Sequence, residues 1–102
     1  MNCAGKLKLL ADETRLAVME RLLRGSCHAG ELAEELDVEQ SLMSHHLKLL
    51  RGAGLVHAKR DGKAVLYSLA AGVETRSAGA GINLECCQLT FERKKKRKGR
   101  GR

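Results

Sequence analysis

Aromatic residues are scarce in this chain: Tyr67 and Phe91 are the only two, and tryptophan is absent. The core must therefore be built from Leu, Val, Ala and Met. A chain of 102 residues is expected to form one domain, near the size at which a single core is marginal. We therefore expect the protein to gain stability by forming a homodimer.

Long hydrophobic runs and catalytic motifs are also missing. No apolar run approaches the roughly 20 residues that a membrane span needs, and residues 1–15 lack the roughly 7–15-residue apolar run of a signal peptide. We therefore expect a cytoplasmic protein with no membrane partner. The chain has no CxxC motif, no phosphate-binding glycine loop and no carboxylate–histidine arrangement typical of a catalytic site. An enzyme is accordingly not expected.

Basic residues are in excess, but the excess lies at one end of the chain. The formal net charge is +7, and residues 93–102 hold eight of the nineteen Lys and Arg residues and no acid. The rest of the chain has eleven bases against twelve acids. We expect this tail to be disordered and to act as a nonspecific phosphate-binding arm whose effect falls steeply with salt. A solubilising end without DNA contact is the alternative.

Residues 40–50 (QSLMSHHLKLL) carry the most informative pattern. Their apolar side chains follow helical spacing and are expected to face a core; these are Leu42, Met43, Leu47 and Leu50. The outer face keeps an amide, hydroxyls, an imidazole and a cation, which suit base edges and phosphates. These candidate DNA-binding residues are Gln40, Ser41, Ser44, His45 and Lys48. An ordinary solvated helix would usually be rich in Glu and Lys at these positions.

The residues around this helix predict a helix-turn-helix. Residues 29–37 (AGELAEELD) form a short amphipathic pattern, and Asp37 tolerates the left-handed geometry of a tight corner. Gly52 and Gly54 follow the second helix and are expected to end it.

A hairpin is predicted next. Residues 55–60 and 64–69 resemble two strands, and Asp61-Gly62 between them is a hairpin signal. Helix, turn, helix and hairpin together predict a winged helix-turn-helix over residues 1–70, a mainly α fold with a small β-hairpin (α+β). Cations on the second helix and the wing are expected to hold backbone phosphates: Lys48, Arg51, Lys59, Arg60 and Lys63.

Four segments carry a resemblance to a known family: LADETRLAVMERLL (10–23), ELA (31–33), SxxSHHLKLLRxAGLV (41–56) and VLYSL (65–69). Together, over about residues 7–70, they resemble the ArsR/SmtB family. The resemblance implies a small dimeric repressor that leaves its operator when metal ions, metalloids or oxidants reach its cysteines. Glu39 departs from the family, which usually has a Ser there that can cap the recognition helix. Glu is a weaker N-cap than Ser, although its charge suits the helix dipole.

Beyond the wing the chain departs from the family's long dimerisation helix. Residues 71–81 contain glycines and little apolar periodicity, which favours a linker. In residues 82–92 the apolar side chains alternate, with a phase slip at Cys86-Cys87 that is typical of a bulge or bend. We therefore predict an extended, cysteine-bearing segment, and the family's dimer interface is not predicted from the chain.

The cysteines bear on what the protein senses. Four cysteines in a cytosolic chain favour thiols or ligands over a disulfide framework. Cys27, Cys86 and Cys87 could supply three sulfurs to a soft ion such as As(III), Cd or Hg, and no other cofactor is expected. Cys3, near a flexible end, is not expected to take part. A small apolar role for any single cysteine is the alternative.

Adjacent cysteines are poor partners for each other. Their Cα atoms are about 3.8 Å apart, below the roughly 4.4–6.8 Å range of disulfides, so joint chelation by Cys86 and Cys87 needs a kink. An oxidant sensor would more naturally bridge Cys27 to one of the pair. His28 matches a position where many members of the resembled family carry a cysteine. The family's carboxylate-and-histidine zinc site has no counterpart on a last helix, so zinc, nickel and cobalt are not expected through that site.

Together these patterns predict a homodimeric transcriptional repressor that binds a double-stranded DNA operator and is released by a soft metal or metalloid. Two alternatives stay open. One is a repressor that senses oxidants or reactive sulfur through its thiols, and the other is a winged-helix DNA binder with no sensing role.

Overall fold

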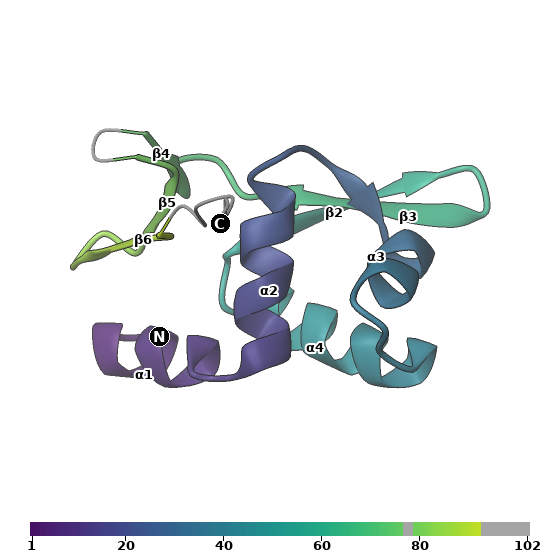
Figure 1. The fold of residues 1–102 in the computed structure, drawn as a ribbon, viewed down its shortest axis with the longest axis horizontal. Coiled ribbons are helices and arrows are strands. Elements are labelled where there is room, and N and C mark those ends of the chain that lie inside the picture. Colours follow the sequence, from purple (N-terminus) through teal and green to yellow (C-terminus); the bar gives the residue numbers. More distant parts are fainter. Residues whose placement is uncertain (77–78, 93–102) are drawn as a thin grey trace, which may run out of the picture.

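The protein's structure is a computed structural model that describes residues 1–76 and 79–92. Its helices are α1 (Cys3–Leu10), α2 (Glu13–Leu22), α3 (Ala29–Glu35) and α4 (Gln40–Gly52). Its strands are β1 (Cys27–His28), β2 (Val56–Asp61), β3 (Ala64–Leu69), β4 (Glu74–Thr75), β5 (Gly81–Asn83) and β6 (Gln88–Thr90). Figure 1 shows the β2–β3 hairpin and the β4–β6 strands on opposite sides of α2. Among the described residues, no helix is long and apolar enough to cross a membrane.

Side-chain caps fix the starts of the first two helices. The Asn2 side-chain oxygen accepts a hydrogen bond of 2.8 Å from the Gly5 amide at the start of α1. Asp12 does the same for α2, with its carboxylate 3.0 Å from the Arg15 amide. These bonds satisfy backbone donors that the helix itself leaves free.

The predicted helix-turn-helix is confirmed. Asp37 lies between α3 and α4 with a φ of 55°, the left-handed conformation expected for the corner. Helix α4 runs over the predicted residues and ends at Gly52, and Gly54 follows with a φ of 77°. The chain can therefore turn directly from α4 into the hairpin.

The wing is also present. Strands β2 and β3 pair antiparallel from Val56 opposite Leu69 to Asp61 opposite Ala64. Gly62 adopts a φ of 65° in the connecting turn, which a residue with a Cβ adopts only with strain. Strand β1 adds to the other edge of β3. The fold class is thus the predicted winged helix-turn-helix, with four helices and small antiparallel sheets in the described part of the chain.

The glycine-containing segment 71–81 is more than a linker. Its β4 strand pairs with β5, and β5 pairs with β6 within the segment predicted to be extended. A side chain at Gly81 would clash with the backbone carbonyl of Leu89 on β6, so glycine allows the two strands to approach. Val73 of the predicted linker is buried in the core, so this segment packs against the rest of the domain; residues 77–78 lie outside the described residues.

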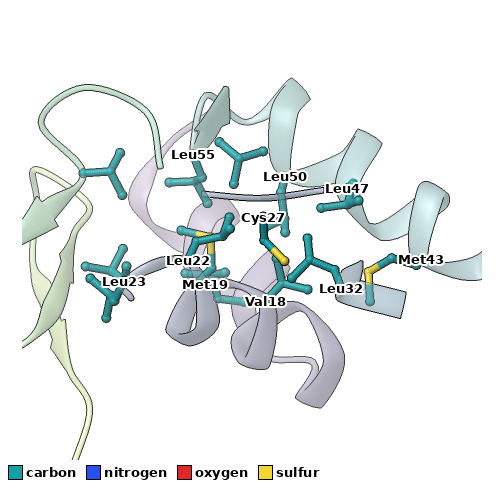
Figure 2. Packing of buried hydrophobic residues seen from close by; sticks show 14 of the residues in the cluster. Val18, Met19, Leu22, Leu23, Cys27, Leu32, Met43, Leu47, Leu50 and Leu55 are labelled. Carbon is teal, nitrogen blue, oxygen red and sulfur yellow. The ribbon is translucent and has the colours of Figure 1, made fainter. Parts of the chain in front are cut away.

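One continuous core includes side chains from the winged helix-turn-helix and from the segment that follows it. Figure 2 shows Val18, Met19 and Leu22 of α2 packed with side chains from α3, α4 and the start of the wing. The second sheet contributes Ile82 and Leu84, which are 0% and 1% exposed. Leu42 was expected in this core but is 48% exposed, because it lies off the buried stripe of α4. The predicted tail, residues 93–102, lies outside the described residues.

Candidate DNA-binding surface and cysteine cluster

The outer face of α4 presents the side chains that the sequence proposed for base contact. All five are exposed: Gln40, Ser41, Ser44, His45 and Lys48. The opposite face is buried through Met43, Leu47 and Leu50. Gln40 lies beside Gly30 of α3, where a Cβ would be 3.4 Å from the Gln40 amide nitrogen. A Cβ at that distance would make an ordinary van der Waals contact, so the Gln40 amide packs directly against α3.

Glu39 caps α4 and also holds one of these side chains. Its carboxylate accepts hydrogen bonds from the Ser41 hydroxyl at 2.6 Å and from the Leu42 amide at 3.1 Å. These bonds, the Ser41 bond first, lower the pKa of the Glu39 carboxyl. In this state the Ser41 hydroxyl donates to Glu39, so contact between Ser41 and a base requires the hydroxyl to rotate away or to act as an acceptor.

Cations flank the α4 face on two elements. They are Lys48 and Arg51 on α4 and Lys59, Arg60 and Lys63 on the wing, and all five are exposed. Within the described part of the chain, none of the five forms a salt bridge with a carboxylate. The charges of these five side chains, two on α4 and three on the wing, are therefore available to phosphates.

His28, at the start of α3, holds the turn end of the wing. Its Nε2 lies 2.8 Å from an Asp61 carboxylate oxygen at the end of β2, and its Nδ1 lies 3.1 Å from Glu31. The Asp61 and Glu31 carboxylates raise the pKa of the His28 imidazole, since both ring nitrogens have an acceptor when the ring is protonated. The sequence predicted no role for His28, although the family resemblance placed it where many members carry a cysteine.

His46, next to the exposed His45, lies on the buried side of α4 and is only 7% exposed. Its Nδ1 lies 3.1 Å from Arg15 Nη1. The same guanidinium donates from Nε to the Leu9 backbone carbonyl at 2.7 Å. Arg15 of α2 therefore connects the end of α1 to α4. The sequence contained a signal for this contact, because position 46 lies three residues after Met43 and four before Leu50, on the helix's apolar stripe.

Cys27, the expected third sulfur, belongs to the core. It is 1% exposed and stands opposite Tyr67 in the β1–β3 pair. Its Sγ lies 3.8 Å from a Glu31 carboxylate oxygen. Burial raises the pKa of the Cys27 thiol, which disfavours the thiolate form that binds ions.

Cys3 takes the place that was expected of Cys27. It forms a disulfide with Cys86 across a Cα–Cα distance of 6.1 Å, and the free Cys87 sulfur lies 3.9 Å from Cys3 Sγ and 4.0 Å from Cys86 Sγ. Among the described residues, these three form the one group of three Cys, His, Asp or Glu side chains spaced to hold a metal ion. Cys3 was missed because it is 83 residues from Cys86 and no local pattern links the two.

The fold and the α4 surface define a winged helix-turn-helix protein of the bacterial regulator type. The family described as "Bacterial regulatory protein, arsR family" matches residues 12–58. The solved structure of HlyU from Vibrio cholerae N16961 is 34% identical, with a TM-score of 0.63, over 71% of this chain and 84% of that chain. The chain belongs to the arsR family of bacterial regulatory proteins.

The chain is also similar to two other proteins. The HTH-type transcriptional regulator CmtR from Mycobacterium tuberculosis H37Rv is 43% identical over 72 residues, which are 71% of this chain and 61% of CmtR. A domain of Mb0332 from Mycobacterium bovis, described as homodimeric and DNA-binding, is 30% identical with a TM-score of 0.60, over 63% of this chain and 59% of that chain. The chain thus spans less than two thirds of the length of these two relatives.

Proposed function

We propose that this protein is a sequence-specific transcriptional repressor that leaves its DNA operator when a soft metal or metalloid ion binds cysteine thiolates. The observation that carries the DNA-binding part is the exposed face of α4. It presents an amide, hydroxyls, an imidazole and a cation, backed by a fully buried apolar stripe. A helix of this kind fits the major groove, where amides and hydroxyls meet base edges.

The wing would supply the second contact. Its exposed cations, Lys59, Arg60 and Lys63, suit backbone phosphates, which position a protein without specifying sequence. The hydrogen bond between His28 and Asp61 holds the turn end of this wing against the start of α3. Helix α3 therefore fixes the position of the wing relative to α4.

We propose that the protein acts as a homodimer. Two recognition helices related by a two-fold axis match a palindromic operator, and the related Mb0332 domain is described as homodimeric. The dimerisation helix of the resembled family is absent from residues 70–76 and 79–92, which form turns and strands. The dimer contact must therefore involve other surfaces of the chain.

Sulfur chemistry supports the effector class. The one group of candidate ligands in the described structure consists of cysteine sulfurs alone, and soft thiolates favour soft ions over hard ones. The Cys3–Cys86 disulfide favours a second candidate, a repressor that senses oxidants or reactive sulfur. A DNA affinity that does not respond to soft ions, oxidants or cysteine substitution would leave the third function, DNA binding without sensing.

The DNA-binding assignment is tested by two substitutions on different elements. An operator is first selected from a random DNA pool with the reduced full-length protein. Gln40→Ala should then cost about 1–3 kcal/mol on that operator, the value of a bidentate base contact, and leave binding to random DNA unchanged. Lys63→Ala should weaken binding to both DNAs alike and flatten the salt dependence by about one unit.

A matched control comes from α1, far from the wing. Lys8 is exposed there and is not assigned a DNA contact, so Lys8→Ala should change neither affinity nor salt slope. Equal effects of Gln40→Ala on operator and random DNA would contradict the proposed base-contacting face.

A further inference from the structure

We propose that Cys3, Cys86 and Cys87 form a three-thiolate site for one soft, thiophilic ion, and that the Cys3–Cys86 disulfide is the closed form of the same site. This inference deepens the proposed function and rests on it for the effect on DNA, while ion binding itself does not depend on DNA. The site joins the first helix to the turn between β5 and β6, two segments at opposite ends of the described chain.

The turn between β5 and β6 brings the two adjacent cysteines together. The Leu84 amide donates to the Cys87 carbonyl at 2.8 Å, which closes a four-residue turn. Glu85 adopts a φ of 77° within it, and its amide donates to the Asn83 side-chain oxygen at 2.9 Å. This turn supplies the kink that two neighbouring cysteines need, because in a regular strand their side chains point to opposite faces.

A second contact holds α1 against this turn. The Lys6 ammonium donates to the Leu84 carbonyl at 3.4 Å and lies 4.0 Å from the Glu85 carboxylate. Lys6 is one helical turn from Cys3, so the helix meets the turn through a hydrogen bond as well as through sulfur. This contact can keep Cys3 close to the pair when the disulfide is reduced.

The sulfur positions fit a trigonal ion. The three Sγ atoms all lie within 4.8 Å of one another, and Cys87 Sγ is 3.9 Å and 4.0 Å from the other two. With zinc–thiolate bonds of about 2.3 Å, three sulfurs in a plane with the ion lie about 4.0 Å apart, and a larger soft ion such as Cd²⁺ places them somewhat farther apart. Only the Cys3–Cys86 pair must separate for the site to form, and it does so when its bond is broken.

Access and ligand type favour a soft ion. Cys86 is exposed, and Cys3 and Cys87 are half-buried, so an ion can reach all three sulfurs from solvent. The set contains sulfur alone, which suits soft ions and not magnesium or calcium. The sulfur of Cys27, in contrast, is buried in the core and not accessible to an ion from solvent.

Opening the site is a two-electron reduction. A dithiol reductant transfers two electrons and two protons; the Cys3–Cys86 bond breaks, both residues become thiols, and the reductant becomes a disulfide. The three thiols then release their protons as the ion bonds to their sulfurs. Because a disulfide sulfur is not a thiolate, the closed form offers one thiol and cannot hold the ion at three points.

The experiment titrates Cd²⁺ into the full-length protein without DNA. Anaerobically reduced protein should bind one tight Cd²⁺ per chain, seen as ultraviolet thiolate-to-metal charge transfer, whereas the disulfide form should not. Cys3→Ser, Cys86→Ser and Cys87→Ser should each lower the affinity at least about 100-fold, since even the loss of a ligand's hydrogen-bond partner costs 10–100-fold. Cys27→Ala, the matched control, should keep wild-type affinity.

A second measurement covers the case in which the Cys27 variant does not fold. Bound Cd²⁺ should protect three residues of the wild-type protein from alkylation: Cys3, Cys86 and Cys87. Cys27 should react slowly with or without the ion. Equal Cd²⁺ affinity in the oxidised protein, full affinity in Cys3→Ser, or ion-dependent protection of Cys27 would each overturn the site. Normal Cd²⁺ binding with no change in operator affinity would instead contradict the proposed function and leave the site standing.

Discussion

Replacing His46 by leucine should destabilise the protein and weaken operator binding together, because this side chain joins α4 to the rest of the fold. His46 is 7% exposed, and its Nδ1 lies 3.1 Å from Arg15 Nη1. Leucine keeps the apolar contacts of the ring and removes the acceptor. The Arg15 guanidinium is then left with one donor unpaired in a partly buried place.

The size of the effect follows from that unpaired donor. A hydrogen bond to a charged group contributes about 1.5–3 kcal/mol. The Arg15 side chain is 17% exposed, so water recovers part of this loss, and we expect a destabilisation of about 1–2 kcal/mol. For a domain of this size, each kcal/mol of destabilisation lowers Tm by about 4–8 °C. Asparagine, whose amide oxygen can stand near the Nδ1 position, should lose less.

The assay is thermal and urea unfolding at fixed protein concentration, since dimerisation makes stability depend on concentration. A double-mutant cycle of His46→Leu with Arg15→Met isolates the contact and should give a coupling of about 0.5–3 kcal/mol. His45→Leu is the matched control on the adjacent, exposed position: it should leave Tm unchanged and reduce operator affinity. A coupling near zero would refute the role given to this contact.

Three further predictions follow from other contacts. Asp12→Ala should lower the free energy of unfolding by about 1 kcal/mol at neutral pH through loss of the α2 cap. Hydrogen bonding from the Arg15 amide lowers the pKa of Asp12 below its usual 3.8. In acid unfolding, the difference in stability between variant and wild type should therefore shrink only as pH falls below that value. Asp61 and Glu31 raise the pKa of His28 above 6.5. The stabilisation from the hydrogen bond between His28 and Asp61 should therefore be full below pH 6.5 and fall as pH rises through the folded pKa. It should be absent in Asp61→Asn, and NMR titration of the His28 ring follows the pKa. Deleting residues 93–102 should leave Tm unchanged and lower low-salt affinity for random DNA by orders of magnitude if several of its cations meet phosphates; unchanged affinity would show that the tail makes no such contact.

The helix-turn-helix and wing were predictable because local chemistry determines them. The apolar spacing of residues 40–50, the left-handed corner at Asp37 and the Gly62 turn each act over a few residues, and all point to the same fold. One expectation within α4 was wrong for a geometric reason. Leu42 was expected to face the core with Met43, Leu47 and Leu50 but lies at the exposed edge of the stripe, whereas His46, which was given no role, lies on the buried side.

The cysteine cluster was only half predictable for a different reason. The adjacent pair and the need for a kink between them could be inferred from the sequence, and the turn at Glu85 supplies that kink. The partner could not be inferred, because Cys3 is 83 residues from Cys86 in the sequence and meets it only in the folded chain. Cys27 was favoured by its place before the helix-turn-helix, but its position on the inner side of β1 buries it.

The position of the cluster suggests how thiol chemistry would act on DNA binding. The proposed ion site fixes the start of α1, and the end of α1 contacts Arg15, which contacts His46 on the inner side of α4. The wing is held separately, through His28 and α3. A change at the cysteines would therefore reorient α4 relative to the wing rather than move both together. An ion that binds the DNA-free arrangement about 100-fold more tightly shifts the equilibrium by about 2.7 kcal/mol, comparable to the expected value of the Arg15–His46 contact. If the coupling runs through this contact, His46→Leu should bind Cd²⁺ normally and respond to it less in operator binding.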